Sequence, residues 1–204
     1  LGIADATGIA QKYGLVKGPG QGSGYVDVPK GVWYEEAVEY VRDQGIMFGM
    51  NDTYFGAAEF LERSHFVTMI YRMAGEPKTQ FDFKFPDVPD GTFYSLPVTW
   101  ASDKGIITGY LNGIFGPTNR MTREELATMI YRYAKSKGID VSEKAELDKF
   151  PDYGSVTDFA QEAVSWAVEK GIITGDQGKI QPQKGASRAD TATMIMRYVK
   201  MYGK

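Results

Sequence analysis

The chain has 204 residues, with 23 basic and 26 acidic side chains and a formal net charge of −3. It has no basic block, so we do not expect nucleic acid as a partner, and no apolar run is long enough to insert into a membrane. The absence of cysteine excludes disulfides and thiolate metal sites. With 43% hydrophobic residues, the composition is that of a globular protein.

The chain begins at Leu1, without a methionine or a charged and then apolar leader. We expect either that a signal peptide has been removed or that the chain is a trimmed piece. Residues 1–24 form an N-terminal segment that is rich in glycine after a short apolar stretch. Within it, residues 14–18 echo a Gly-x-x-x-Gly element that recurs later in the chain.

Beyond this segment the chain repeats one pattern three times. In each copy an aspartate is followed 36 residues later by an arginine, and five residues after the arginine comes a Thr-Met-Ile motif. A Gly-x-x-x-Gly element lies between the aspartate and the arginine. Because units of about 50 residues rarely bury enough surface alone, we expect the three to fold as one cooperative unit. The repeats span 25–75, 85–138 and 150–200.

Each repeat is predicted to hold two helices separated by a glycine-rich loop. The first helices are expected at 33–44, 94–104 and 159–170, and the second at 62–73, 122–136 and 187–201. Gly105 takes the C′ position after a first helix. The apolar stripe of a second helix runs through Leu126, Met129, Ile130 and Tyr133, so we expect the Thr-Met-Ile motifs to build the core. The links at 76–84 and 137–149 are polar, and the second could hold a helical turn.

The second helices differ in how they begin. Thr122 and Glu125 stand three residues apart before an apolar stripe, which predicts a capping box. Ser187 and Asp190 form a weaker version of the same box. The first repeat lacks it, because His65 occupies the place of the acid. His65 is the single histidine, and no partnered nucleophile accompanies it, so we do not expect it to be catalytic.

The arginine of each repeat allows two interpretations. Arg123 and Arg188 are expected at N1 of their helices, where a cation opposes the helix dipole, so fold stability gives no reason to choose arginine. An anionic ligand would give a reason, because free amides at a helix start and a guanidinium together suit a carboxylate or phosphate. The alternative is a surface arginine paired to a neighbouring acid such as Asp87 or Asp152.

Other chemistry is not indicated. No P-loop, Rossmann fingerprint, zinc motif or calcium loop is present, and no carboxylate pair is marked as an acid/base pair. We therefore expect no catalytic residue, metal or cofactor. The aromatic residues that begin the first helices suit the core more readily than a sugar-binding surface, but both remain open. They are Trp33, Phe93 and Phe159.

In this order and three times over, the motifs resemble the S-layer homology (SLH) domain. The second repeat carries the pattern most fully, with Phe-Pro-Asp-Val at 85–88, Gly-Ile-Ile-Thr-Gly at 105–109, Gly-Ile-Phe-Gly-Pro at 113–117 and Thr-Arg-Glu-Glu at 122–125. The resemblance covers residues 25–200. It implies an all-α fold, in which three helix-loop-helix repeats form a pseudo-threefold, three-pronged bundle with a central helical core and ligand grooves between the prongs.

The resemblance also implies a function. Such domains attach secreted proteins non-covalently to bacterial cell-wall polysaccharide, often one that bears pyruvate ketals, so we expect an extracellular protein at the cell wall. The implied partners are a secondary cell-wall polysaccharide or a peptidoglycan-linked glycan, and self-assembly is a further implied role. The alternative is a structural or assembly module whose degenerate grooves bind another surface protein. An enzyme is not expected, because catalytic domains lie beside such repeats and not within them.

The resemblance assigns ligand-binding residues by motif. Gly49, Gly109 and Gly175 would let backbone approach a sugar. The other candidates are the arginines Arg63, Arg123 and Arg188, the aspartates Asp27, Asp87 and Asp152, and the aromatics Trp33, Phe93 and Phe159, of which the last two groups could equally be turn or core residues.

The repeats depart unequally from the family pattern. The first has Thr53 and Ala57 where glycine and proline are usual, and the third has a shortened loop at 176–179. We therefore expect unequal grooves, with the best one near Arg123. We expect the loss of that side chain to weaken binding and to leave the melting temperature nearly unchanged.

Overall fold

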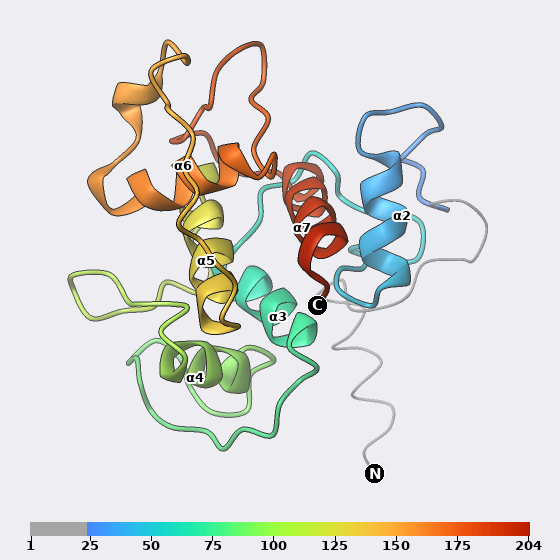
Figure 1. Ribbon diagram of the computed structural model, residues 1–204. Coiled ribbons are helices and arrows are strands. Elements are labelled where there is room, and N and C mark those ends of the chain that lie inside the picture. Colours follow the sequence, from blue (N-terminus) through green and yellow to red (C-terminus); the bar gives the residue numbers. More distant parts are fainter. Residues whose placement is uncertain (1–23) are drawn as a thin grey trace. The chain divides into compact units, whose positions relative to one another are not determined.

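The computed structural model describes residues 24–204, so the Gly-x-x-x-Gly element at 14–18 lies outside the described residues. The described residues form six α-helices and two short 3-10 helices, with isolated bridges but no strand among them, which confirms the all-helical prediction (Figure 1). The α-helices are α2 (Glu35–Asp43), α3 (Arg63–Met73), α4 (Ser95–Asp103), α5 (Arg123–Ser136), α6 (Gln161–Glu169) and α7 (Arg188–Tyr202), and the 3-10 helices are η1 (Tyr153–Ser155) and η2 (Asp158–Ala160).

The second helix of each repeat begins where the sequence predicts. Thr122 Oγ accepts from the Glu125 amide and Glu125 Oε2 accepts from the Thr122 amide at 2.9 Å, so the capping box at α5 is complete. Ser187 and Asp190 form an equally complete box at α7. The first helices begin one or two residues later than expected, and the link at 137–149 carries no helix.

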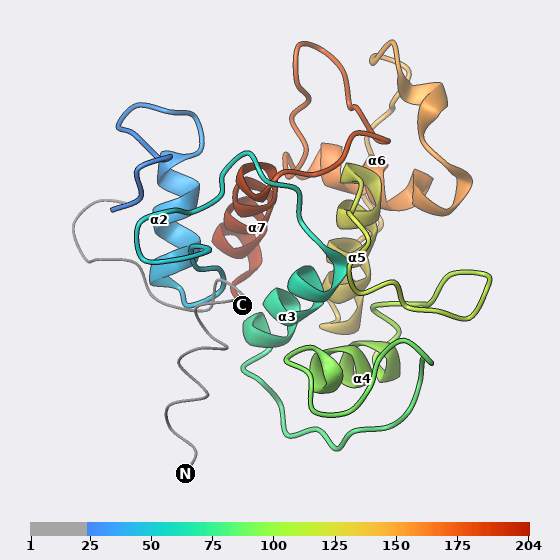
Figure 2. The same cartoon turned by 180° about the vertical axis from the view of Figure 1, so that it is seen from behind.

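The chain divides into two compact units. By their place along the sequence, we call residues 24–60 and 187–203 the outer unit and residues 61–186 the middle unit. The outer unit contains the helix pair α2 and α7, and the middle unit contains the pairs α3 with α4 and α5 with α6 (Figures 1 and 2). Each pair therefore joins the first helix of one repeat to the second helix of another. These are the pairs that three repeats linked in cyclic order require.

The predicted stripe on α5 lies in the core of the middle unit. Leu126, Met129, Ile130 and Tyr133 are all at most 4% exposed. In the outer unit the matching residue of α7, Ile195, is also buried. Among the described residues, no helix has the length and apolar character needed to cross a membrane.

The aspartate of each repeat closes the loop that precedes the second helix. Asp87 Oδ1 accepts from the Phe115 amide at 2.8 Å, and its Oδ2 accepts from the Gly116 amide at 2.7 Å. Charge-assisted bonds of this kind satisfy buried backbone donors that the loop cannot pair itself. The other repeats do the same at the same spacing: Asp27 with the amides of Phe55, Gly56 and Ala57, and Asp152 with those of Ile180 and Gln181.

These bonds affect titration in the third repeat. Burial raises the pKa of the Asp152 carboxyl, but the amides of Gln181 and Ile180 outweigh it, so the net pKa lies below its usual value. A carboxyl whose pKa is lower in the folded state stabilises the fold above its unfolded pKa, about 3.9. That contribution is lost as the pH falls through the folded pKa.

We expect Asp152→Asn to lower the free energy of unfolding at pH 7 by about 1–2 kcal/mol, because the carboxylate charge is lost at a partly exposed site and one of the two loop amides loses its acceptor oxygen. Urea denaturation at pH 7 and pH 3 measures the difference, which should shrink at pH 3. Asp148→Asn, at an exposed position in the preceding link, is the control. A difference that stays equal at both pH values would contradict the assignment.

Candidate functional site

The three arginines begin α3, α5 and α7, as predicted, but their side chains do not lie on the surface. Arg63, Arg123 and Arg188 are 5%, 6% and 6% exposed. Burial lowers the pKa of Arg188 to about 10, so its guanidinium stays charged at neutral pH. The interpretation of these residues as surface arginines is therefore wrong.

Each arginine holds a loop of another repeat. Arg63 Nε donates to the Phe115 carbonyl at 3.0 Å, Arg123 Nε to the Ile180 carbonyl at 3.1 Å, and Arg188 Nε to the Phe55 carbonyl at 2.9 Å. These carbonyls belong to the residues whose amides bind the aspartates. The arginine of the first repeat thus binds a loop of the second, the arginine of the second binds a loop of the third, and the arginine of the third binds a loop of the first.

This arrangement corrects the argument that fold stability gives no reason for an arginine at N1. The dipole of its own helix disfavours the cation by a few tenths of a kcal/mol. A hydrogen bond from a buried cation to a backbone carbonyl contributes about 1.5–3 kcal/mol, which outweighs that cost. The aspartates proposed as surface partners bind loop amides instead. The arginine and the aspartate of the pattern therefore act on the same loop residue from opposite sides.

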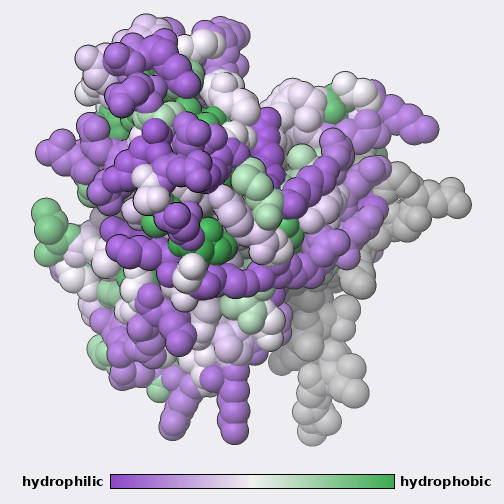
Figure 3. Space-filling view, viewed as in Figure 1, coloured by the Kyte–Doolittle hydropathy of each residue, from purple (hydrophilic) through white to green (hydrophobic). Residues whose placement is uncertain are grey.

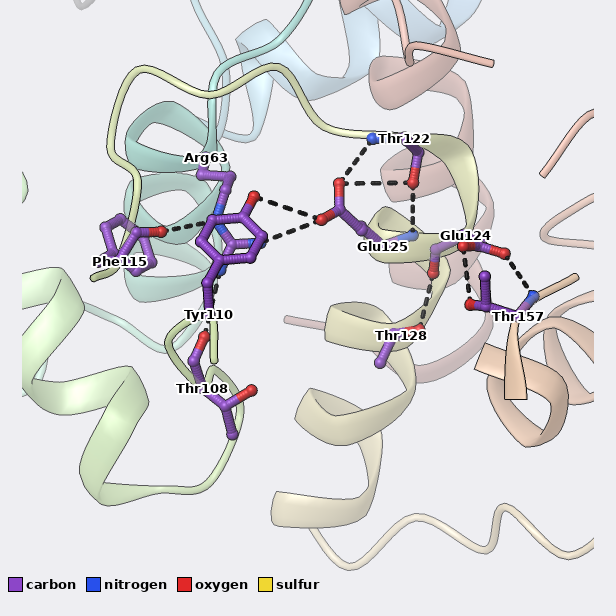
Figure 4. A network of polar contacts seen from close by, with 9 residues as sticks. All are labelled: Arg63, Thr108, Tyr110, Phe115, Thr122, Glu124, Glu125, Thr128 and Thr157. Atoms are coloured by element: carbon purple, nitrogen blue, oxygen red, sulfur yellow. Dashed lines mark hydrogen bonds and ion pairs between the residues drawn. The ribbon is translucent and has the colours of Figure 1, made fainter. Parts of the chain in front are cut away.

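A cavity of about 360 Å³ lies beside Arg63 within the middle unit. The loop after α4, one face of α5 and one aromatic residue of the third repeat surround it. Figure 4 shows Arg63 and Glu125 facing each other, with the Tyr110 ring beside them. The lining residues are Arg63, Thr108, Gly109, Tyr110, Leu111, Glu125, Thr128, Met129, Arg132 and Phe159.

Arg63 has little freedom left for a ligand. Besides its Nε bond to Phe115, its Nη2 donates to the Thr108 carbonyl at 3.2 Å. Its Nη1 lies 3.6 Å from Glu125 Oε1, and its Cζ lies 4.6 Å from the centre of the Tyr110 ring. Nη1 is therefore the nitrogen through which an anion could reach Arg63.

Arg132 is the second cation at the cavity. Its guanidinium has no hydrogen bond or ion pair to the part of the chain that the structure describes. Desolvation lowers its pKa, and the like charge of Arg63 lowers it further. The lining of the cavity thus carries two guanidinium groups and one carboxylate, that of Glu125. The net charge of the lining is therefore +1.

The neighbouring acid, Glu124, is not available to a ligand. It is 2% exposed, and its carboxylate accepts from the amide and hydroxyl of Thr157 and from the side-chain amide of Gln183. Figure 4 shows this bond between α5 and the segment before η2. It fixes the start of η2, which carries Phe159 to the rim of the cavity.

The structure brings together Arg63, Gly109 and Phe159 from the predicted ligand residues. A Cβ at Gly109 would lie 2.6 Å from Phe85 Cε1 and 2.9 Å from the Ile114 carbonyl oxygen. The loop therefore needs glycine for its own packing, whatever it binds. Gly49 meets the same obstacle, with Tyr25 Cε1 at 2.4 Å.

Other predicted residues have other neighbours. The three aspartates point at loop amides, as described above. Phe93 stacks on His65 with ring centres 5.3 Å apart, and the φ of Gly175 is +83°. Trp33 and Phe159 are 65% and 57% exposed, so the interpretation of these two as core residues is wrong. Among the described residues, no group of three or more His, Cys, Asp or Glu side chains could hold a metal.

Sequence reasoning missed Arg132, although a signal was present. An arginine follows each Thr-Met-Ile motif at a fixed spacing, as Arg72, Arg132 and Arg197. The motif was assigned to the core alone, yet Thr128 and Met129 border the cavity. The assignment of the best groove to Arg123 stays a prediction.

The burial of Arg123 changes the expected effect of its loss. Arg123→Ala should lower the free energy of unfolding by about 2–3 kcal/mol, because it leaves the Ile180 carbonyl without its charged donor. Chemical denaturation measures this, with Lys104→Ala at an exposed position as the control. An unchanged stability would restore the interpretation that the side chain serves a ligand alone.

Comparison with known proteins agrees with this architecture. The profile of the S-layer homology domain matches three segments, 24–67, 84–127 and 149–192. Over 172 residues the chain is 27% identical to an endoglucanase of Bacillus sp. (strain KSM-635). This matched segment is 84% of this chain and 18% of that protein. It is 27% identical to an S-layer protein of Bacillus licheniformis and 26% identical to the S-layer protein EA1 of Bacillus anthracis, each over 187 residues.

The two S-layer matches cover 90% of this chain and 20% and 21% of those proteins, so the chain spans about a fifth of their length. Similar sequences thus occur in S-layer proteins and in a protein named as an endoglucanase. The three profile matches together cover more than half of the residues, in the same order and register as the repeats described above. The chain belongs to the S-layer homology domain family.

Proposed function

We propose that this chain anchors a larger protein to the bacterial cell surface by binding an anionic cell-wall polysaccharide, and that the cavity beside Arg63 is a binding site for that polymer. The proposal is supported by membership of a family shared with S-layer proteins. The chain acts as a binding module, and the activity of enzyme relatives belongs to the parts of those proteins outside the matched segment.

The observation that carries the proposal is the uncompensated charge of Arg132. A half-buried guanidinium next to a second guanidinium loses hydration and gains repulsion, and residues 24–204 offer no ion pair that offsets this cost. An anionic group in the cavity would offset both. A carboxylate suits the planar fork of arginine, and a pyruvate ketal on a sugar supplies one.

The size and rim of the cavity support a sugar unit as the bearer of that group. About 360 Å³ is near the lower end of the range for small-molecule sites, so one monosaccharide with its substituent fits better than a long segment. Exposed Leu111 and Phe159 give the rim an apolar surface beside the charges.

The face seen in Figure 3 favours a hydrated polymer over a large protein partner. Figure 3 shows a face that is mostly hydrophilic, with hydrophobic residues in small and separate spots. Protein-binding sites more often present a contiguous apolar patch of several hundred Å². Binding to another surface protein is thus the less favoured function, and the sacculus experiment below separates the two.

Wall sacculi that carry their secondary polymer should retain the chain, and sacculi stripped of that polymer by acid should not. Retention is measured by sedimentation of sacculi with bound protein. Retention that survives stripping would overturn the proposed binding to the polymer, and a chain that neither preparation retains would favour another surface protein as the partner.

Arg132→Gln should weaken binding to intact sacculi by about 1.5–3 kcal/mol, as for a lost hydrogen bond to a charged group. The melting temperature should not fall, because Arg132 has no partner within the described chain. Lys135→Gln, exposed on the same helix, removes the same charge outside the cavity and is the control. Equal affinity of Arg132→Gln and the parent chain would exclude Arg132 from the site.

A further inference from the structure

Glu125 has two roles that oppose each other at the cavity. Its Oε2 accepts from the Thr122 amide at 2.9 Å in the capping box of α5. Its Oε1 faces Arg63 Nη1 at 3.6 Å and Tyr110 Oη at 3.5 Å (Figure 4). The side chain is 17% exposed. Because the cap holds one oxygen, the carboxylate cannot turn away from the cavity without loss of the cap.

The same geometry blocks the accessible nitrogen of Arg63. Nε and Nη2 already donate to the carbonyls of Phe115 and Thr108. An incoming anion must therefore approach Nη1, which Glu125 already neutralises. The anion would also come close to the carboxylate of Glu125, whose side chain is largely buried, and like charges at a partly desolvated site repel each other more than they do in water.

We propose that the carboxylate of Glu125 competes with an anionic ligand for Arg63. This competition limits the affinity of the cavity for anions and makes Arg132 the main residue that binds the negative charge of the ligand. This inference rests on the proposed function, since it concerns the affinity of the same site. A ligand is then selected by where its charge lies: near Arg132 it is accepted, and near Glu125 it is repelled.

The sequence of the other repeats supports a tuning role. Two residues after the arginine, the three repeats have His65, Glu125 and Asp190, whereas the arginine itself does not vary. The side chain at this position thus differs in charge and length among the three repeats. Capping alone does not require this carboxylate at every repeat, because α3 begins at Arg63 without a side-chain cap.

The test is Glu125→Gln, because glutamine keeps the capping box and removes the charge. Its amide oxygen can accept from the Thr122 amide, and its amide nitrogen then takes the place of Oε1 as a donor toward the cavity. The probes are a methyl hexoside with a pyruvate ketal and the methyl ester of the same compound, which is uncharged. Calorimetric titration measures the affinity of each chain for each probe.

We expect Glu125→Gln to bind the acidic probe about tenfold more tightly than the parent chain, the effect of one nearby charge on an ionic equilibrium. The ester should bind both chains within a factor of about two, on the same reasoning. Glu146→Gln changes the net charge equally at an exposed position outside the cavity lining and should leave both affinities unchanged. The melting temperature of each variant verifies that it is folded.

The outcomes separate the two proposals. If the parent chain binds the acidic probe and Glu125→Gln binds it equally or more weakly, the competitor role is overturned and the proposed function stands. An equal gain for the ester would also overturn the competitor role, because the gain would not depend on charge. If neither chain binds the acidic probe, the assignment of an anionic sugar to this cavity fails, and the inference fails with it.

Discussion

One loop residue in each repeat is held from both sides by charged side chains, and the rest of the fold depends on that contact. In the second repeat Asp87 binds the amide of Phe115 and Arg63 binds its carbonyl. The aspartate belongs to the same repeat as the loop, and the arginine belongs to the repeat before it. The contact therefore fixes the loop, orients the start of α3 and joins two repeats in a single step.

The geometry of the proposed binding site depends on this contact. The loop that Asp87 and Arg63 hold carries Gly109 and Tyr110 to the cavity, and α5 supplies Glu125 and Arg132 from the other side. A side chain that both stabilises the fold and lines a site cannot be tested for ligand binding by simple removal. Arg132, without a partner in the described chain, can be tested in this way.

Local features were predictable from the sequence, and contacts between repeats were not. The capping box of Thr122 and Glu125 was predicted because its atoms are three residues apart. The fixed spacing of aspartate and arginine indicated a repeated element, but distance along the chain does not say which repeat an arginine reaches. The dipole of α5 disfavours a cation at Arg123, but the bond of Arg123 to the Ile180 carbonyl in another repeat outweighs that effect and cannot be read from one helix alone. Arg132 was missed because a cavity is formed by three segments, whereas helical periodicity describes one.

The order of the arginine contacts limits how this module can change in length. In a solenoid each repeat contacts its neighbours, and the ends are open, so repeats can be gained or lost singly. Here Arg188 of the third repeat binds Phe55 of the first, and the series of donors closes after three. Removal of one repeat would leave a guanidinium and a loop carbonyl buried without their partners. A chain shortened by one repeat would therefore lose stability unless the remaining arginine and loop carbonyl met each other.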